Sequence, residues 1–360
     1  MRRSWQRSGG SRWSFLAAGA ACAALAGALP SLPASAAPVN QLTVYVSPSG
    51  TASAKAMDSR AGLTGDTAVS SIEEAQAILR ARRAQNAKVL LTDGLYQPTA
   101  PIKVDWSPPG GQLTIAGVGA AAVIDCSLFE DNSPNTEYGV IVSADNVRIS
   151  GQTYQNCRNG GIRANGTAAN PLDALNVSGN TFRRLGSKYQ AGPGNGYGGV
   201  HATYTTRLRV EGNLFQNLEN TAGTGVAEIH GVYVANYGSN TTIYGNKFEL
   251  ISGDPVRTRN RANNTIVDAN MFWKTGSYAI FSDWRYSTEG CSTNGIFSAN
   301  KVGTTTYNND SWNEDGQGSI SIVRVRLWGH DAATDANLYG CSSDPITFSG
   351  TNSYVSTRPW

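Results

Sequence analysis

The chain has few charged residues, few histidines and, after its first residues, no long apolar run. Charged side chains make up 15% of the 360 residues, with 29 Lys and Arg against 26 Asp and Glu, and histidine occurs 3 times. Because acidic and basic residues nearly balance, the chain has no strong basic field for nucleic acid. No stretch after the first 36 residues is apolar enough to span a membrane. The composition therefore excludes nucleic-acid-binding and membrane-embedded proteins, and the length predicts a sizeable core.

The first 36 residues have the organisation of a secretory signal peptide. Four arginines precede an apolar run over about 15–29, and Ala-Ser-Ala at 34–36 is typical of a cleavage site. Removing this segment, which carries four arginines and no acid, leaves 25 basic and 26 acidic residues, a net charge of 25 − 26 = −1. We expect residues 1–36 to be removed and residues 37–360 to form one secreted, extracellular, monomeric domain.

Cysteine is also scarce. One of the five cysteines, Cys22, lies in the expected signal peptide, and Cys126, Cys157, Cys291 and Cys341 remain. Four cysteines in an exported chain predict two disulfides, for which three connectivities are open. We expect Cys126–Cys157 and Cys291–Cys341, the pairs nearest in sequence. The spacing does not match a zinc site, so a structural role is favoured.

Repetition is the chain's main positive feature. A short β-branched strand, a small turn residue, Asn and an apolar residue two positions further recur, and a weaker copy begins at Val147. The repeated asparagines, separated by 33, 33, 24 and 30 residues, are Asn180, Asn213, Asn246, Asn270 and Asn300. Each repeat has too few apolar residues to bury by itself, and none has a helical period, so the repeats must stack.

This pattern predicts an all-β chain folded as a right-handed parallel β-helix, a solenoid in which each repeat forms one coil. The asparagines would occupy one turn of every coil, where Asn tolerates left-handed backbone geometry and its side-chain amide can bond the next coil. A second strand is expected immediately after each Asn turn. We expect the coils to cover about residues 101–350.

The segment before the coils has a different pattern, which predicts a capping helix. Ser71 can cap the helix with Glu74 at the capping-box position, and Ile72, Ala75, Ile78 and Leu79 would form its apolar stripe. A strand is expected over residues 89–91. The cap, over about residues 42–100, would cover the open end of the solenoid, because an uncovered first coil exposes strand edges and core.

Together, these segments resemble a known superfamily. "VYVSPSG" at 44–50, the helix, "VLLTDGLYQ" at 89–97 and the Gly-Asn-x-Phe coils resemble secreted pectate-lyase-like β-helix proteins, over most of the chain after about residue 42. The resemblance implies the fold, with carbohydrate as the expected class of partner. It leaves the activity open, because the superfamily includes polysaccharide lyases, glycoside hydrolases, epimerases and non-catalytic surface proteins.

The second strands place a distinctive set of side chains on the outer face of the solenoid. Aligning Ile162, Val200, Val232 and Val256 as inward residues gives an outward row one position later, by the alternation of β-strands. This first row is Arg163, His201, Tyr233 and Arg257. A second row two positions further is Asn165, Thr203, Ala235 and Arg259. The rows would span roughly 14 Å along the coils, since parallel strands lie about 4.8 Å apart.

These residue types suit β-elimination in a uronic-acid polymer. The proton beside a carboxylate becomes acidic enough to remove only when the carboxylate's charge is neutralised, which arginine or a bound cation can do. A base must accept that proton, and an acid must protonate the leaving oxygen. We expect His201 and Tyr233 to exchange the protons, Arg257 and Arg259 to hold the carboxylate, and Arg163 to bind a neighbouring sugar.

Further residues are predicted to contact the substrate beside these rows. They are His230, Asp254, Trp284 and Arg285. The sequence predicts a polysaccharide lyase acting on an extracellular acidic polysaccharide, with no certain cofactor and with Ca²⁺ as an alternative means of neutralising the carboxylate. The Arg-x-Pro-x-x-Arg type signature of pectate lyases and their calcium-binding aspartate cluster are missing.

Alternative interpretations remain open from the sequence. Arg257, Arg259 and Arg261 could form an ordinary solvated strand face paired with Asp254 and Asp268. A glycoside hydrolase would need two carboxylates roughly 5–9.5 Å apart, and the plausible set is Asp254, Asp283 and Glu228. An epimerase shares the first proton abstraction, and a non-catalytic carbohydrate-binding solenoid would need none of this chemistry.

Overall fold

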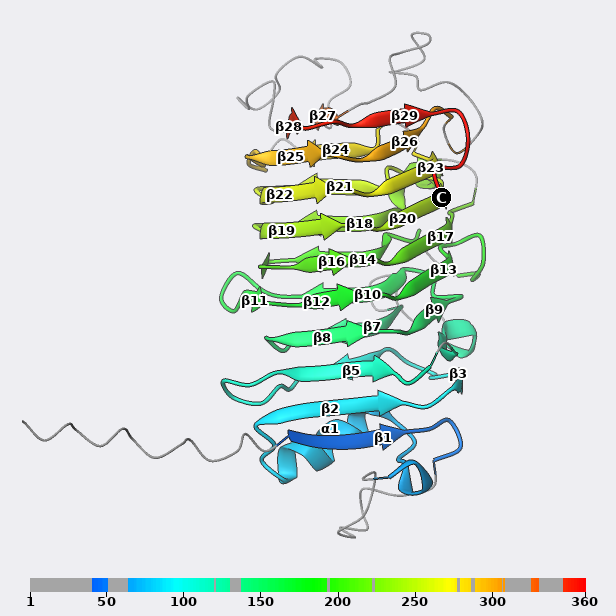
Figure 1. Ribbon diagram of the computed structural model, residues 1–360, viewed down its shortest axis with the longest axis vertical. Coiled ribbons are helices and arrows are strands. Elements are labelled where there is room, and N and C mark those ends of the chain that lie inside the picture. The colour runs from blue at the N-terminus through cyan, green and yellow to red at the C-terminus, as the bar shows by residue number, and fades with distance from the viewer. Residues whose placement is uncertain are drawn as a thin grey trace, which may run out of the picture. The chain divides into compact units, whose positions relative to one another are not determined.

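The computed structural model is a solenoid of stacked coils in which all paired strands run parallel (Figure 1). It describes residues 41–50, 64–119, 121–129, 137–192, 195–221, 224–276, 279–285, 289–305, 307, 325–329 and 346–360. The expected signal peptide lies outside these residues. None of the helices in the described ranges is long and apolar enough to cross a membrane.

The strands form three sheets, which we name A, B and C. Sheet A contains β1 (Gln41–Val46), β2 (Asn86–Leu91), β5 (Leu113–Gly117), β8 (Val147–Ser150), β11 (Leu172–Asp173), β12 (Asn176–Ser178), β15 (Thr205–Thr206), β16 (Arg209–Glu211), β19 (Ser239–Tyr244), β22 (Asn263–Asp268), β25 (Gly295–Ser298) and β28 (Ile346–Ser349). Sheet B contains β3 (Gly94–Tyr96), β6 (Ala122–Asp125), β9 (Thr153–Gln155), β13 (Thr181–Leu185), β17 (Leu214–Leu218), β20 (Lys247–Ile251), β23 (Met271–Thr275), β26 (Lys301–Gly303) and β29 (Ser353–Val355). Sheet C contains β4 (Ile102–Val104), β7 (Tyr138–Val142), β10 (Gly160–Asn165), β14 (Gly198–Thr203), β18 (His230–Ala235), β21 (Val256–Arg259), β24 (Phe281–Arg285) and β27 (Val325–Gly329).

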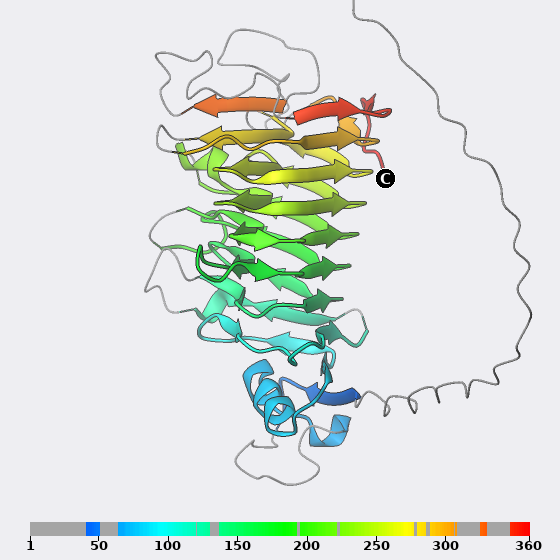
Figure 2. The same cartoon turned by 90° about the vertical axis from the view of Figure 1, so that its left-hand side faces the viewer.

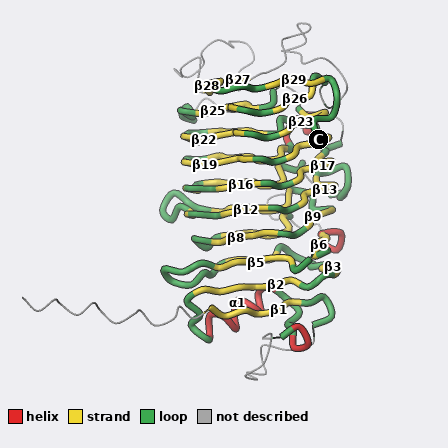
Figure 3. The backbone as a smooth tube through the Cα atoms, in the orientation of Figure 1, coloured by secondary structure: helices red, strands yellow, loops and turns green. Residues whose placement is uncertain are grey.

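Each coil from β2 to β27 contributes a strand to all three sheets, and Figure 3 shows the coils stacked one above another. The sequence pattern predicted two strands in each coil. The structure has three, because the residues after each repeated Asn, such as Thr181–Leu185, pair as strands of their own in sheet B. The first complete coil, β2 to β4, begins at Asn86. The three all-parallel sheets confirm the predicted parallel β-helix architecture, and right-handed winding is the sense that parallel crossovers almost always adopt.

The repeated asparagines occupy the turn between sheets A and B, as predicted. In each coil the Asn side-chain oxygen accepts a hydrogen bond from the backbone N–H of the corresponding residue in the preceding coil, at 2.9–3.1 Å. The asparagines themselves do not adopt left-handed backbone geometry. That conformation belongs to the preceding residue, with φ of 64° at Gly179 and 63° at Gly245. The small residue of the repeat therefore makes the bend, and Asn bridges the coils.

Aromatic rings behind this turn form the regular part of the core. Tyr154, Phe182, Phe215, Phe248 and Phe272 stack one above another, with ring centroids 4.8–5.2 Å apart and planes within 11° of parallel. All five side chains are fully buried. This spacing equals the distance between parallel strands, so one aromatic position per coil suffices to continue the stack.

The predicted helix α1 (Ile72–Ala81) lies at the β1 end of the solenoid (Figures 1 and 2). The Ser71 hydroxyl accepts a hydrogen bond from the Glu74 N–H at 3.1 Å, whereas the Glu74 carboxylate reaches back to Ser70. The predicted apolar stripe is buried. Three 3₁₀ helices, η1 (Gly65–Thr67), η2 (Cys126–Leu128) and η3 (Thr224–Glu228), complete the described helices.

Two further contacts tie parts of the solenoid together. The predicted Cys126–Cys157 disulfide is present and links adjacent coils across 31 residues of sequence. The predicted Cys291–Cys341 pair involves Cys341, which lies outside the described residues. After β29 the chain folds back along sheet B, where Arg358 donates to the Glu249 carboxylate of β20 at 2.7 Å.

Candidate functional site

The outer face of sheet C has the two predicted rows of side chains. Arg163 pairs with His201, His201 with Tyr233, and Tyr233 with Arg257 in the register of β10, β14, β18 and β21. Asn165, Thr203, Ala235 and Arg259 align in the same register. The expected inward residues are buried in the core. The alternation of the strands therefore predicted the direction of these side chains correctly.

His201 lies at the centre of an aromatic cluster. Its ring stacks on that of Tyr233, with centroids 4.8 Å apart and planes at 17°, and Tyr197 lies 5.7 Å away. The Tyr138 hydroxyl forms a 2.6 Å hydrogen bond with His201 Nδ1. Tyr138 reaches His201 across the intervening coil beside Gly160, where a Cβ atom would lie 3.0 Å from the tyrosine ring. The hydrogen bond uses Nδ1, so Nε2 is the ring nitrogen not engaged by Tyr138.

The surroundings of His201 keep its imidazole uncharged at neutral pH. Burial, and then the positive charges of Arg163 and Arg259, lower the pKa of His201 to about 3. A neutral imidazole can accept a proton at Nε2 when Nδ1 carries the hydrogen and donates it to the Tyr138 oxygen. The structure thus places a proton acceptor between two arginines.

Tyr233 and Arg259 form the next part of the site. Arg259 Nη1 donates to the Tyr233 hydroxyl at 3.3 Å, and the same guanidinium forms an ion pair with Glu289, with Nη2–Oε1 at 2.5 Å and Nε–Oε1 at 2.8 Å. Burial raises the pKa of Tyr233, although the charge of Arg259 opposes this. The phenol therefore stays protonated at neutral pH and can serve as an acid. Glu289 was not predicted from the sequence.

Arg257 differs from its predicted role. Its Nη2 donates to Asp254 at 2.6 Å and its Nε donates to the Ser282 hydroxyl at 3.1 Å. The Trp284 ring lies 4.9 Å from the guanidinium carbon, and Arg257 is only 7% exposed. Tyr233 is equally 7% exposed, so what separates Arg257 from its predicted role is Asp254, three residues earlier, which neutralises its charge.

The same burial corrects the predictions for two neighbouring residues. Asp254 is fully buried, and Arg257 keeps its pKa below the usual value although burial opposes this. His230 is 1% exposed, and its Nδ1–H donates to the Asp254 backbone oxygen at 2.7 Å. Its ring lies 5.3 Å from that of Tyr233. Both side chains are buried beneath the row. Their burial is at odds with the prediction that they contact the substrate. Trp284 is half-buried beside Arg257, and the side chain of Arg285 lies outside the described residues.

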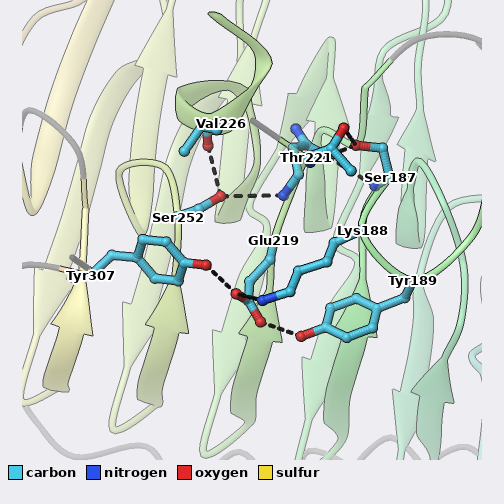
Figure 4. A network of polar contacts seen from close by, with 9 residues as sticks. Ser187, Lys188, Tyr189, Glu219, Thr221, Val226, Ser252 and Tyr307 are labelled. Atoms are coloured by element: carbon cyan, nitrogen blue, oxygen red, sulfur yellow. Dashed lines mark hydrogen bonds and ion pairs between the residues drawn. The ribbon is translucent and has the colours of Figure 1, made fainter. Parts of the chain in front are cut away.

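The segment before β14 is fastened to the next coil. Asn220 accepts hydrogen bonds from the backbone N–H groups of Ser187 and Gly196, at 3.1 and 2.8 Å, and so holds both ends of the intervening loop. Figure 4 shows the second attachment, in which the buried Glu219 carboxylate accepts hydrogen bonds. Its donors are Lys188, Tyr189 and Tyr307.

Although burial opposes ionisation of Glu219, these hydrogen bonds hold its pKa below the usual value. Glu219 is thus a charged anchor for the segment that ends at Tyr197. Because Tyr197 lies against His201, the anchor fixes one wall of the aromatic cluster.

The carboxylates considered for a hydrolase differ in burial and in hydrogen-bond partners. Asp283 aligns with Thr258, whose hydroxyl donates to it at 2.8 Å, on the inward side of sheet C. Glu228 is exposed and accepts a hydrogen bond from Asn195 at 2.9 Å. Within the described ranges, no group of three or more His, Cys, Asp and Glu side chains is arranged to hold a metal ion. Of the two ion pairs expected for a solvated arginine face, Asp254–Arg257 is present, whereas Asp268 accepts from Ser298.

The chain is similar to known proteins in its structure but not in its sequence. No protein-family model and no curated protein matches the sequence. An alginate lyase from Paenibacillus sp. str. FPU-7 is similar, with a TM-score of 0.47, 15% identity, and coverage of 87% of this chain and 95% of that one.

Two other solved structures are similar at lower scores. A rhamnogalacturonan lyase has a TM-score of 0.37, 10% identity and coverage of 79% of this chain and 86% of its own. A lacto-N-biosidase from Eubacterium ramulus has a TM-score of 0.37, 10% identity and coverage of 87% and 67%. At these identities the likeness concerns the backbone fold, which the parallel sheets establish independently.

Proposed function

We propose that this protein is a secreted polysaccharide lyase that cleaves an acidic, uronic-acid-containing polymer by β-elimination. One observation carries the proposal: an uncharged histidine lies on the outer face of sheet C between the charges of Arg163 and Arg259, with a protonated tyrosine stacked on it. Base, acid and carboxylate-binding groups are the parts that this reaction requires.

The proposed roles follow from this geometry. The uronate carboxylate binds to Arg259, which exchanges Glu289 for the substrate and neutralises it, and Arg163 binds a neighbouring sugar. His201 Nε2 removes the proton from the carbon beside the carboxylate. The electron pair forms a carbon–carbon double bond as the neighbouring glycosidic C–O bond breaks, and the Tyr233 hydroxyl protonates the leaving oxygen.

Substrate binding would also strengthen the base. In the free protein, burial and then the two arginine charges lower the pKa of His201 to about 3, which makes the imidazole a weak proton acceptor. A bound carboxylate cancels part of the arginine charge, so it raises the pKa of His201 in the complex. His201 therefore becomes a stronger base only when the substrate carboxylate is bound by arginine, which is also the condition under which the substrate's proton becomes acidic.

The test is incubation of the secreted protein with polygalacturonate, alginate and glycosaminoglycans, with calcium or with a chelator. Ultraviolet absorbance and reducing ends are followed in parallel. Elimination predicts that both increase, because each cleavage creates one unsaturated sugar and one reducing end. Reducing ends without absorbance would replace elimination by hydrolysis, and a sugar inversion without cleavage would indicate an epimerase.

A further inference from the structure

Two tyrosines and an arginine form an ordered strip at the corner where the chain leaves sheet C. Tyr204, Tyr237 and Arg261 follow β14, β18 and β21. The two tyrosine rings have centroids 5.8 Å apart and planes at 13°. The Arg261 guanidinium carbon lies 5.0 Å from the centre of the Tyr237 ring, and its Nη1 donates to the Tyr237 hydroxyl at 2.6 Å. We call these three residues the corner ladder.

The conformation of the corner ladder is fixed by the backbone beneath it. All three residues have left-handed φ angles, of 48°, 62° and 62°. Asn260 donates to the Asn236 side chain at 2.9 Å and accepts from the Gly290 N–H at 3.1 Å. A Cβ atom at position 290 would lie 2.3 Å from Arg261 Nε, so glycine leaves room for the arginine. The backbone and these contacts therefore hold the side chains in place.

The corner ladder is also exposed. Tyr237 is 50% exposed although it is stacked, and Arg261 is exposed as well. The ring centroids are further apart than the roughly 4.8 Å between coils, so the rings are offset and do not cover one another completely. An aromatic ring with a hydroxyl tip suits the apolar and polar parts of a sugar, and an adjacent guanidinium suits a carboxylate.

The position of the corner ladder connects it to the proton-transfer residues. Tyr237 lies four residues after Tyr233, and Arg261 lies two residues after Arg259, so the chain length limits the distance between the two sets to at most about 13 Å. That is a span of a few sugar residues. The two Tyr–Arg contacts, Tyr233–Arg259 and Tyr237–Arg261, repeat the same pairing between neighbouring coils.

We propose that the corner ladder is a second sugar-binding site, which takes another uronate residue of the same polysaccharide chain. Arg261 binds its carboxylate, and Tyr237, supported by Tyr204, contacts its ring. The polymer then runs along the strands of sheet C toward the corner. This inference rests on the proposed function for the identity of the polymer.

The experiment measures binding separately from turnover. The Tyr237→Ala variant is compared with Tyr244→Ala, because Tyr244 is also 50% exposed but lies at the end of β19 in sheet A. Migration is measured in native gels with polygalacturonate or alginate, and dextran serves as the neutral reference. We expect Kd to rise about tenfold for Tyr237→Ala and to stay unchanged for Tyr244→Ala. Arg261→Gln should weaken binding of the acidic polymers.

The outcomes separate the two proposals. Loss of binding in Tyr237→Ala without turnover by the unmodified protein would support the corner ladder and overturn the lyase. Turnover by the unmodified protein, with undiminished binding by Tyr237→Ala, would support the lyase and overturn the corner ladder as a sugar-binding site. A lower Tm of Tyr237→Ala with unchanged Kd would show that the tyrosines only stabilise the corner. Failure of the unmodified protein to bind either acidic polymer would overturn the proposed ligand class.

Discussion

The turn between sheets A and B repeats one residue, whereas the outer face of sheet C changes residue from coil to coil. At the turn, Asn180, Asn213 and Asn246 make the same hydrogen bonds and are at most 1% exposed. On sheet C the corresponding coils present His201, Tyr233 and Arg257. Stacking of coils requires repetition, because each position must match its neighbours. Departure from repetition is therefore the more informative signal for function.

The largest effect is expected where the row is broken at its proton-transfer residues. His201→Gln and Tyr233→Phe should each lower kcat about 10²–10⁴-fold, because each removes one proton-transfer group. Initial rates on the polymer that the unmodified protein cleaves provide the measurement. Tyr244→Phe, which removes an exposed hydroxyl from sheet A, is the matched control and should retain full activity. Turnover that survives in the double variant would remove both residues from the mechanism.

The repeated asparagines at the turn between sheets A and B form a column, the repeated column. Breaking it should lower the stability of the fold. Asn213→Ala removes the hydrogen bonds to Val177 and Asn246 and leaves the buried backbone N–H of Asn180 without its acceptor. We expect unfolding free energy to fall by about 3 kcal/mol, measured by urea denaturation.

The control for the repeated column is an exposed asparagine. Asn264 also forms side-chain hydrogen bonds with Asn240 and Asn294 in the adjacent coils, but it is exposed to solvent. Asn264→Gly keeps the left-handed backbone, where φ is 56°, and should cost below about 1 kcal/mol. Equal losses in the two variants would mean that burial does not distinguish these columns.

The sequence predicted direction better than accessibility. Period-two alternation placed Arg257 on the outward side correctly, because strand geometry is local. It did not reveal that Asp254 neutralises the arginine and that Trp284 covers it, since these contacts depend on side-chain conformations at a coil corner. The exposure of Arg257 and of Tyr233 was therefore overestimated.

The sequence also missed residues that reach the site from other coils or loops. Tyr138 contacts His201 across an intervening coil, and Glu289 reaches Arg259 from the segment after β24. Neither belongs to the row that the repeats define. The glycine at position 160 is no signal for Tyr138, because a side chain there would first meet the Gly198 backbone oxygen, at 1.9 Å.

A smaller effect should appear in the titration of His201. Its pKa is lowered by burial and then by Arg163, so Arg163→Gln should raise it toward the ordinary value of about 6.5. With three histidines in the chain, NMR titration can follow the ring directly. Because protonated His201 cannot act as base, the acidic limb of kcat/KM should move to higher pH in the variant. Arg183→Gln, on sheet B, should leave the titration unchanged.

The smallest effect is expected from Glu289, which changes the charge around Tyr233 without touching the base. Burial raises the pKa of Tyr233, the Arg259 charge lowers it, and the Glu289 charge raises it. Glu289→Gln should therefore lower the pKa of Tyr233 and move the alkaline limb of kcat to lower pH by less than about one unit. It should also reduce KM a few-fold, because Arg259 no longer exchanges a carboxylate for the substrate. Glu211→Gln, which disrupts the Arg209 ion pair on sheet A, should change neither quantity. An unchanged alkaline limb would show that Tyr233 does not supply the proton, and an increased KM would show that Glu289 holds Arg259 in its binding position.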